Sequence, residues 1–239
     1  MSSPAQRDLT GERPEWLTFD CYGTLIQWDE GLIAAVERIL ARTGSRVSAG
    51  TFMAVHDRHE HRLEQERPHR SFRDVSARAL ALAMTELSLP LDEGDAEILI
   101  SSIGRMPPFP EVVPTLSKLK GAGYKLAIIS NTDDEIIAGN VAQLEGRIDR
   151  VITAQQAQAY KPSAQMFRHA WKSIGTGPGR LVHICASPHL DLAAAHDLGF
   201  RAVWVDRGTG RRPLIDYQPN AVVAALDGVL PLFSRAGWL

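Results

Sequence analysis

The chain has 239 residues, of which 44% are hydrophobic and 23% charged, and its formal net charge at pH 7 is −2. This is the composition of a globular protein that is long enough to bury a large core. The charge is too small for a nucleic-acid-binding surface, and no apolar run approaches the ~20 residues that cross a bilayer. We therefore expect no nucleic-acid and no membrane partner. The two cysteines, Cys21 and Cys185, are expected to be reduced thiols of a cytoplasmic protein.

The first predicted strand is the apolar run Trp16–Phe19, which ends at Asp20. Gly23 follows as a turn residue, and Thr24 places a hydroxyl group four positions after the acid. Short apolar runs bounded by turn residues are typical of buried parallel strands. Asp20 is thus predicted to lie on rigid backbone at the carboxyl end of a strand, facing a crevice.

Residues 30–107 are predicted to form an inserted helical subdomain. Apolar residues recur with helical spacing in residues 32–40 and again in residues 75–87. Residues 107–110 contain three prolines, which make a stiff return linker. The natural position for such a subdomain is over the carboxyl ends of the strands.

One stretch of this insert, residues 56–73, holds four of the eight histidines and five arginines. Its acids, which include Asp57, Glu60 and Glu64, nearly cancel the arginines. Two interpretations are open. The stretch is either a solvated helix face with ion pairs along it, or one or two of its side chains reach into the crevice.

From about residue 110 onward, strand and helix patterns alternate. The further predicted strands are Lys125–Ser130, Arg150–Thr153, Leu181–Cys185 and residues 202–205, and the predicted helices are residues 113–119, residues 134–144, Ala164–Ile174 and residues 191–198. Alternating units of this kind predict an α/β fold with a doubly wound, parallel, Rossmann-like sheet. Residues 1–29 and 108–239 would form this core.

Four polar points lie at or beyond the ends of four of the predicted strands: Asp20, Ser130 with Asn131, Lys161, and Asp191. Taken singly, each has an ordinary structural explanation as a helix cap, a turn or a surface loop. Open α/β sheets, however, bind ligands beyond the carboxyl ends of their strands. We therefore expect these side chains to meet at one site.

In this order, the motifs resemble those of the haloacid dehalogenase-like hydrolase superfamily. They are Asp20-Cys21-Tyr22-Gly23-Thr24-Leu25, Ser130-Asn131, Tyr160-Lys161-Pro162, and Asp191 with Gly199-Phe200. The Asp-x-Tyr-Gly-Thr form resembles the (S)-2-haloacid dehalogenase branch, whose members are metal-free and often dimeric. The resemblance implies a hydrolase that acts on a small carboxylic acid without cofactor or metal, and a homodimer.

The resemblance also implies roles for individual residues. Asp20 would attack the α-carbon of the substrate to form an ester, which water then hydrolyses to a 2-hydroxy acid of inverted configuration. Lys161 would stabilise the ionised form of Asp20, Asp191 would orient Lys161 or the water, and Thr24 would donate a hydrogen bond to Asp20. The expected substrate-binding residues are Tyr22, Cys21, Ser130 and Asn131, with backbone N–H groups beside Tyr22 assisting.

Tyr22 separates this chemistry from that of the phosphatases of the superfamily. Those enzymes carry a second acid two places after the nucleophile, beside Mg²⁺. A hard cation needs several oxygen ligands, so a tyrosine at this place disfavours the metal-dependent reaction. A Mg²⁺-dependent phosphatase remains a second alternative, and a non-enzymatic binding protein a third.

Two departures from the dehalogenase pattern leave the leaving group open. Ala186 and Pro188 stand where the branch usually has serine and asparagine, so the water must be positioned differently. His189 or Ser187 is a candidate for this role, and the alternative is that the segment is only a structural turn. The arginine that assists halide departure has no secure counterpart. Arg58 is one candidate for this place in the sequence, and Asp57 or His56 are the other residues that could occupy it. An acid at that place would suit a protonated amine better than a halide, as in ring opening of L-azetidine-2-carboxylate.

Overall fold

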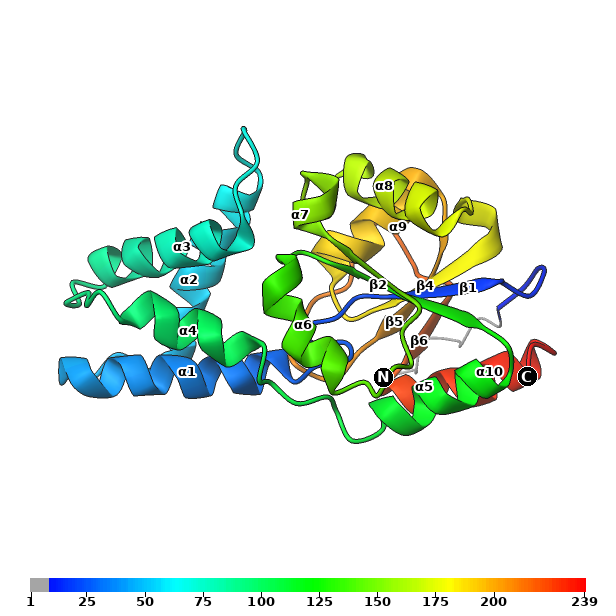
Figure 1. Ribbon diagram of the computed structural model, residues 1–239, viewed down its shortest axis with the longest axis horizontal. Helices are drawn as coiled ribbons and strands as arrows, with labels where there is room; N and C mark the ends of the chain where they lie inside the picture. The colour runs from blue at the N-terminus through cyan, green and yellow to red at the C-terminus, as the bar shows by residue number, and fades with distance from the viewer. Residues whose placement is uncertain (1–8) are drawn as a thin grey trace.

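The computed structural model describes residues 9–239 of the chain. It consists of a central sheet flanked by helices, with a group of four further helices gathered at one side of the sheet (Figure 1). Residues 1–8, where the predicted core begins, lie outside the described part.

The sheet has six parallel strands in the order β3-β2-β1-β4-β5-β6. The strands are β1 (Trp16–Phe19), β2 (Lys125–Ser130), β3 (Arg150–Thr153), β4 (Leu181–Cys185), β5 (Arg201–Val205) and β6 (Ala221–Val223). The predicted α/β, doubly wound, Rossmann-like fold is confirmed. Of the strands, only β6 was not predicted, since three residues are too short to show a strand pattern.

Helices cover both faces of the sheet (Figure 1). The helices of the sheet part are α5 (Val112–Gly121), α6 (Asp134–Ala142), α7 (Ala154–Ala157), α8 (Ala164–Ile174), α9 (Ala193–Leu198) and α10 (Val229–Arg235). Apolar side chains of α5 and α10 pack into one hydrophobic cluster, and those of α8 and α9 pack into a second. Because both faces are covered, the central strands are fully buried, as their apolar composition requires.

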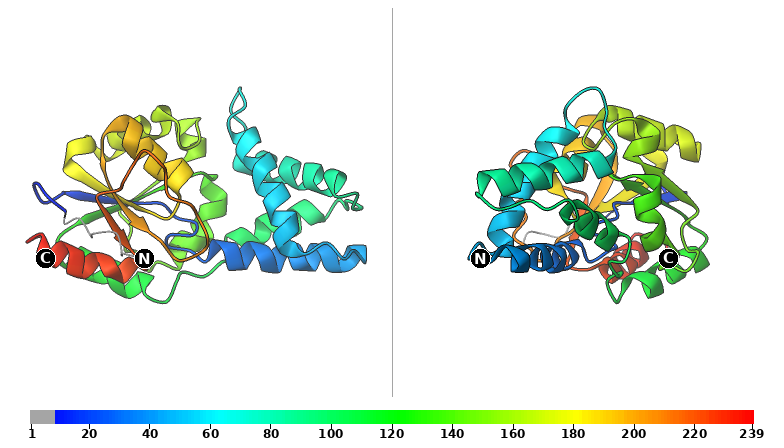
Figure 2. Two further views of the ribbon diagram at one scale, coloured as in Figure 1. Left: turned by 180° about the vertical axis from the view of Figure 1, so that it is seen from behind. Right: turned by 60° about the vertical axis from the view of Figure 1, so that its left-hand side comes forward.

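The remaining four helices are α1 (Trp28–Thr43), α2 (Ala49–Glu64), α3 (Phe72–Glu86) and α4 (Asp95–Ile103). They pack on one another through α2 against α3 and α1 against α4, and stand beside the carboxyl ends of the strands (Figures 1 and 2). The chain leaves and re-enters the sheet part at one place, where Gln27 N donates to Pro107 O at 2.9 Å and Phe109 N donates to Leu25 O at 3.0 Å. We propose that these helices are the predicted cap.

Within the described part of the chain, no helix combines the length and the apolar character that a membrane span requires.

Candidate active site

Asp20 lies in the first position after β1, in the middle of the sheet. Its backbone N–H extends the strand pairing by donating to Ile184 O at 3.0 Å. The chain then turns tightly, because Cys21 O accepts hydrogen bonds from the backbone N–H groups of three later residues, Thr24, Leu25 and Ile26. Gly23 has φ = 80° in this turn, a conformation that favours glycine. The turn fixes the Asp20 backbone at the carboxyl end of β1.

The two oxygens of the Asp20 carboxylate have different partners. Thr24 Oγ1 donates to Oδ2 at 2.6 Å, and Lys161 Nζ donates to Oδ1 at 2.8 Å. The Thr24 hydroxyl in turn accepts the backbone N–H of Ala186, after β4, at 2.8 Å. Because the Thr24 hydroxyl proton is directed at Asp20, the carboxylate accepts hydrogen bonds from two donors, which fix its rotation.

Lys161 joins Asp20 to a second buried acid. Its Nζ also donates to Asp191 Oδ1 at 2.8 Å, and His183 Nε2 lies 2.9 Å from the same oxygen. His183 Nδ1 lies 2.9 Å from the hydroxyl of Thr18, inside the sheet. All of these side chains except Asp20, which is 6% exposed, are at most 1% exposed. Burial alone would lower the pKa of Lys161, but Asp191 and Asp20 reverse this, and the pKa is raised. The lysine therefore carries a firm positive charge.

Asn131, directly after β2, positions the lysine. Its Oδ1 accepts the backbone N–H of Lys161 at 2.7 Å, and its Nδ2 lies 3.3 Å from Lys161 O. The same Nδ2 lies 3.3 Å and 3.4 Å from the two carboxyl oxygens of Glu64 on α2. The amide of Asn131 therefore holds the lysine loop and contacts the helical part of the molecule.

Ser130 and Tyr22 present different groups to the site. Ser130 Oγ is buried and has no hydrogen-bond partner among the described residues. The Tyr22 hydroxyl donates to Asn140 Oδ1 at 3.1 Å, away from Asp20, and its ring lies 4.6 Å from the ring of Trp28. Burial raises the pKa of Tyr22, so the phenol stays neutral. The structure therefore favours packing by the tyrosine ring over hydrogen bonding by its hydroxyl group.

The Cys21 side chain is buried in the hydrophobic core and does not line the pocket described next. Its thiol pKa is raised by burial and by Asp20, so it is not a nucleophile. None of the hydrogen bonds found between described residues uses the N–H groups of Cys21 and Tyr22, which leaves both free to meet a ligand.

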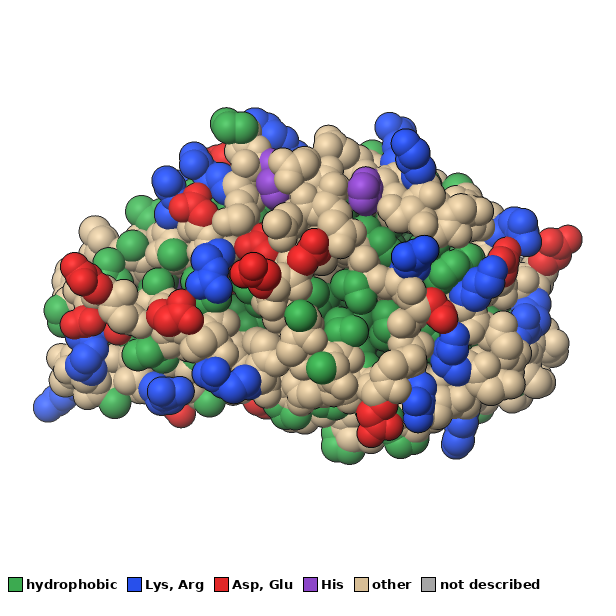
Figure 3. Space-filling view, in the orientation of Figure 1, with side chains coloured by type: hydrophobic (Ala, Val, Ile, Leu, Met, Phe, Trp, Pro, Cys, Tyr) green, Lys and Arg blue, Asp and Glu red, His purple; other side chains and the backbone are tan. Residues whose placement is uncertain are grey.

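A pocket of about 480 Å³ opens over Asp20, at the junction of the sheet and the four-helix group. On the face seen in Figure 3, acidic side chains gather over this junction beside a hollow lined by hydrophobic side chains. The residues that line the pocket from the sheet part include Asp20, Tyr22, Ser130, Asn131, Lys161 and His189, and those from the helices include Trp28, Asp57, Glu60, Glu64 and Phe72. The pocket therefore brings together most of the predicted site residues.

Helix α2 contributes an acidic wall to the pocket, formed by Asp57, Glu60 and Glu64. The sequence alone did not decide whether these residues face solvent or the pocket. His56, Glu60 and Glu64 are at most 8% exposed, although they are polar. Spaced four residues apart, they share the buried face of α2 with Phe52. The sequence signal for this burial was that the acids share a helix face with apolar residues. The solvated-face interpretation is wrong for these three positions.

Arg58 does not reach the pocket. Its guanidinium donates to Glu86 at 2.6 Å on the surface, and its side chain is 59% exposed. Arg58 is thus excluded as the arginine that assists a leaving group, because it faces away. Asp57, the neighbouring candidate, lines the pocket instead.

The loop after β5 reaches the same pocket and supplies its arginines, which the sequence did not indicate. Arg211 and Arg212 line the pocket, and Arg211 Nη2 lies 3.1 Å from Asp29 Oδ1 at the start of α1. Arg207 donates to Thr24 O and to Glu111, both at 2.7 Å.

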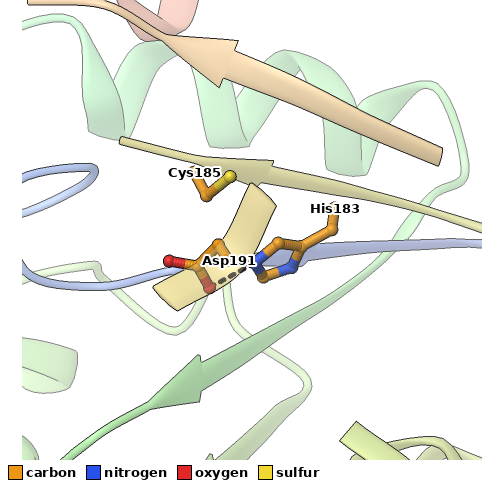
Figure 4. Close-up of side chains that lie close together, drawn as sticks. All are labelled: His183, Cys185 and Asp191. Atoms are coloured by element: carbon orange, nitrogen blue, oxygen red, sulfur yellow. Dashed lines mark hydrogen bonds and ion pairs between the residues drawn. The ribbon is translucent and has the colours of Figure 1, made fainter. Parts of the chain in front are cut away.

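Two groupings of described residues bring together three potential metal ligands. In the first, His183 and Asp191 are joined by a hydrogen bond, and Cys185 lies beside them without a marked interaction (Figure 4). Both ring nitrogens of His183 are engaged, and burial with nearby Asp191 raises the pKa of Cys185, which disfavours a thiolate ligand.

The second grouping is His56, Asp57 and Glu60. Asp57 lies 3.5 Å from His56 Nδ1, whereas Glu60 lies 4.0 Å from Nε2. The two acids face opposite ring nitrogens, so one ion could not take both acids together with one nitrogen at bonding distance.

A parallel α/β sheet with an acid-lysine-acid arrangement at the carboxyl ends of its strands is the framework of a class of hydrolases. The model of the haloacid dehalogenase-like hydrolases matches residues 15–199, and the chain belongs to this family of hydrolases. The chain is 28% identical to (S)-2-haloacid dehalogenase 4A of Burkholderia cepacia over 91% of its own length and 94% of that protein.

Solved structures agree with this fold. The chain resembles a dehalogenase with an intermediate complex at a TM-score of 0.81 and 25% identity, covering 93% of this chain and 98% of that one. It also resembles an L-2-haloacid dehalogenase from Xanthobacter autotrophicus with chloropropionic acid covalently bound, at a TM-score of 0.78 and 21% identity and with the same coverage.

Proposed function

We propose that this hydrolase displaces a leaving group at the α-carbon of a small 2-substituted carboxylic acid, through an ester on Asp20 and without a metal. The observation that carries the proposal is the Asp20 carboxylate, held by Thr24 and Lys161 at the edge of a pocket, with a tyrosine two residues later. Relatives that are named (S)-2-haloacid dehalogenase support this assignment.

In the first step, an Asp20 oxygen attacks the α-carbon, and the bond to the leaving group breaks as the new C–O bond forms. The substrate carboxylate would be held by the free hydroxyl of Ser130 and the free N–H groups of Cys21 and Tyr22. The rings of Tyr22 and Trp28 would pack against the carbon chain. Holding the two reacting atoms in line supplies much of the rate, because it removes the entropy cost of their encounter.

In the second step, water attacks the carboxyl carbon of Asp20. The bond between this carbon and the ester oxygen breaks, the substrate leaves with that oxygen as an alkoxide, and the alkoxide takes a proton to give a 2-hydroxy acid. Lys161 would stabilise the negative charge that develops on the Asp20 oxygen. Asp191, held by His183 and Lys161, would position the lysine. Ser187 and His189, which line the pocket, are the groups that could orient the water.

The acidic wall favours a second candidate for the leaving group. Among the described residues that line the pocket, α2 supplies the acids Asp57, Glu60 and Glu64, together with His61, and no arginine. An anion that departs toward this wall would meet acids. A ring nitrogen, as in L-azetidine-2-carboxylate, would find a favourable partner there.

The test is a substrate panel assayed with and without a chelator. We expect turnover of (S)-2-chloropropionate or of L-azetidine-2-carboxylate to survive EDTA, and Asp20→Asn to lower the rate at least about 10³-fold. Hydrolysis of p-nitrophenyl phosphate that requires Mg²⁺, with no rate on either acid, would replace this proposal by the phosphatase alternative.

We also propose, on the resemblance to the dehalogenase branch, a cytoplasmic homodimer. Light scattering on the eluting protein measures its mass, and a mass equal to that of one chain would contradict the dimer.

A further inference from the structure

Glu60 is a buried acid with an unused acceptor inside the pocket. It is 8% exposed, it lines the pocket together with Asp20, and its Oε1 has no hydrogen-bond partner within the described part of the chain. An unpaired buried carboxyl group costs stability, so proteins rarely keep one unless a ligand completes it. Its position indicates a polar group on the substrate.

His56 lies one helical turn before Glu60 and affects the pKa of this acid. The side chain is 1% exposed, and its Nε2 lies 4.0 Å from Glu60 Oε1. Burial raises the pKa of Glu60 to about 7, against the opposing effect of His56. Burial alone would lower the pKa of His56, but Glu60 and Asp57 raise it overall. Glu60 is thus poised to lose a proton when a cation arrives.

We propose that Glu60 binds a protonated nitrogen on the α-carbon of the substrate, so that the pocket takes small amino or imino acids whose nitrogen is the leaving group. This deepens, and rests on, the proposed displacement at Asp20. The pocket matches such a zwitterion. Arginines Arg211 and Arg212 line it from the loop after β5, and acids line it from α2.

The chemistry balances without a further reactant. Asp20 forms a C–O bond to the α-carbon, and the electron pair of the C–N bond moves to the nitrogen. Because that nitrogen already carries its proton, it departs as a neutral amine and then takes a proton from solvent. Water then hydrolyses the ester at the carboxyl carbon of Asp20, so the oxygen of water enters the Asp20 carboxylate and the original Asp20 oxygen leaves as the hydroxyl group of the 2-hydroxy acid. In a strained ring the amine stays attached to the product through the carbon chain.

Several charged groups share the surroundings of Glu60. On α2 these are Asp57, His61 and Glu64, and burial raises the pKa of Glu64 well above its usual value. The groups that face the pocket from other elements include Asp29, Lys161, His189, Arg211 and Arg212, and Tyr160 lies close enough for Glu60 to affect its pKa. A proton released on binding must therefore be assigned to Glu60 by substitution.

The experiment compares two ligands of one shape by titration calorimetry with Asp20→Asn protein, which prevents turnover. L-Azetidine-2-carboxylate carries the ring nitrogen, and cyclobutanecarboxylate has carbon in its place. We expect the nitrogen ligand to bind at least about 10-fold more tightly, as for one charge-assisted hydrogen bond. Heats measured in buffers of different ionisation enthalpy should show up to about one proton released at pH 6 and almost none at pH 8.

Substitutions show whether the released proton and the tighter binding of the nitrogen ligand come from Glu60. Glu60→Gln should remove both the proton release and the preference for nitrogen, while cyclobutanecarboxylate binds as before. Glu66→Gln makes the same change on a partly exposed acid outside the pocket and should alter neither. His56→Gln should move the release to higher pH, because His56 lowers the pKa of Glu60.

The outcomes separate this inference from the proposed function. Equal binding of the two ligands, or proton release that survives Glu60→Gln, would overturn the role of Glu60. Turnover of 2-chloropropionate that depends on Asp20 would in that case leave the displacement intact. Nitrogen-dependent binding at Glu60 by wild-type protein that turns over neither acid would contradict the displacement instead.

Discussion

Lys161 Nζ lies 2.8 Å from Asp20 Oδ1, and both side chains are buried, although 141 positions separate them in the sequence. The pair forms because β1 ends beside β2 and β4, and the loop that carries Lys161 is held by Asn131 after β2. A charge buried in this way is stable only with its partner in place. Asp20, the proposed nucleophile, and Lys161, which stabilises its negative charge, therefore depend on each other for their burial.

Removing the lysine charge should destabilise the protein as well as inactivate it. Lys161→Met leaves the carboxylates of Asp20 and Asp191 buried without a cation, and we expect a loss of ~3–5 kcal/mol in unfolding free energy. Chemical denaturation measures this loss. Lys161→Arg keeps the charge and serves as the control, and it should lose less. A Lys161→Met protein as stable as the wild type would show that the ion pairs are not formed.

The Thr24 hydroxyl should matter more than the methyl group. Thr24→Val keeps the shape but removes the donor to Asp20 and the acceptor for Ala186 N–H. We expect a loss of about 1–3 kcal/mol in stability and a fall in kcat, because a buried backbone donor is left unpaired. Thr24→Ser retains the hydroxyl and should stay close to wild type. Equal behaviour of the two variants would remove this hydrogen bond from the account.

Asp191 should contribute a stability that depends on pH in a defined direction. Burial would raise its pKa, but Lys161 and His183 lower it overall, so the folded protein favours the ionised form. A lowered pKa gives stability that is present above the unfolded value near 3.8 and disappears as the pH falls through the folded value.

We therefore expect wild type to be more stable than Asp191→Asn at pH 7 by about 1–3 kcal/mol, with the gap closing in acid. Denaturation series from pH 7 down to pH 3 measure the gap. A difference that is constant over this range would contradict the ionised state of Asp191.

Asp133 should control how the helical part is placed on the sheet part. Its carboxylate follows β2 and accepts the backbone N–H groups of Phe72 and Arg73, at the start of α3, both at 2.9 Å. Asp133→Ala should cost about 1 kcal/mol in stability, as for a lost helix cap, and should raise KM because Phe72 lines the pocket. Asp134→Ala, on the next residue, is the comparison. An unchanged KM in Asp133→Ala would show that this contact does not set the pocket.

The fold and the centre of the site could be predicted because their signals are local. Each strand is a short apolar run, and the residue that ends it is a polar group such as Asp20 or Ser130. Parallel topology brings those ends to one edge. The predicted helix Ala164–Ile174 has the same bounds in the structure, where Ser163 and Gly175 cap it.

The wall of the pocket could not be predicted in this way. Whether Glu60 faces solvent or the pocket depends on how α2 is rotated against the sheet, which is a tertiary property. Arg211 reaches the site only because its loop folds back toward Asp29 and Gly23. The apolar neighbours of Glu60 on one helix face were informative, but they did not identify a ligand.

Following the oxygen atom through one turnover tests the central claim most directly. With excess enzyme in ¹⁸O-water, a single turnover of an active 2-substituted acid should place ¹⁸O in the carboxylate of Asp20, while the product hydroxyl takes the original oxygen of that side chain. Mass spectrometry of the peptide that contains Asp20 detects the label. Label in the first product, with an unlabelled Asp20, would mean that water attacks the substrate directly and would contradict an ester on this residue.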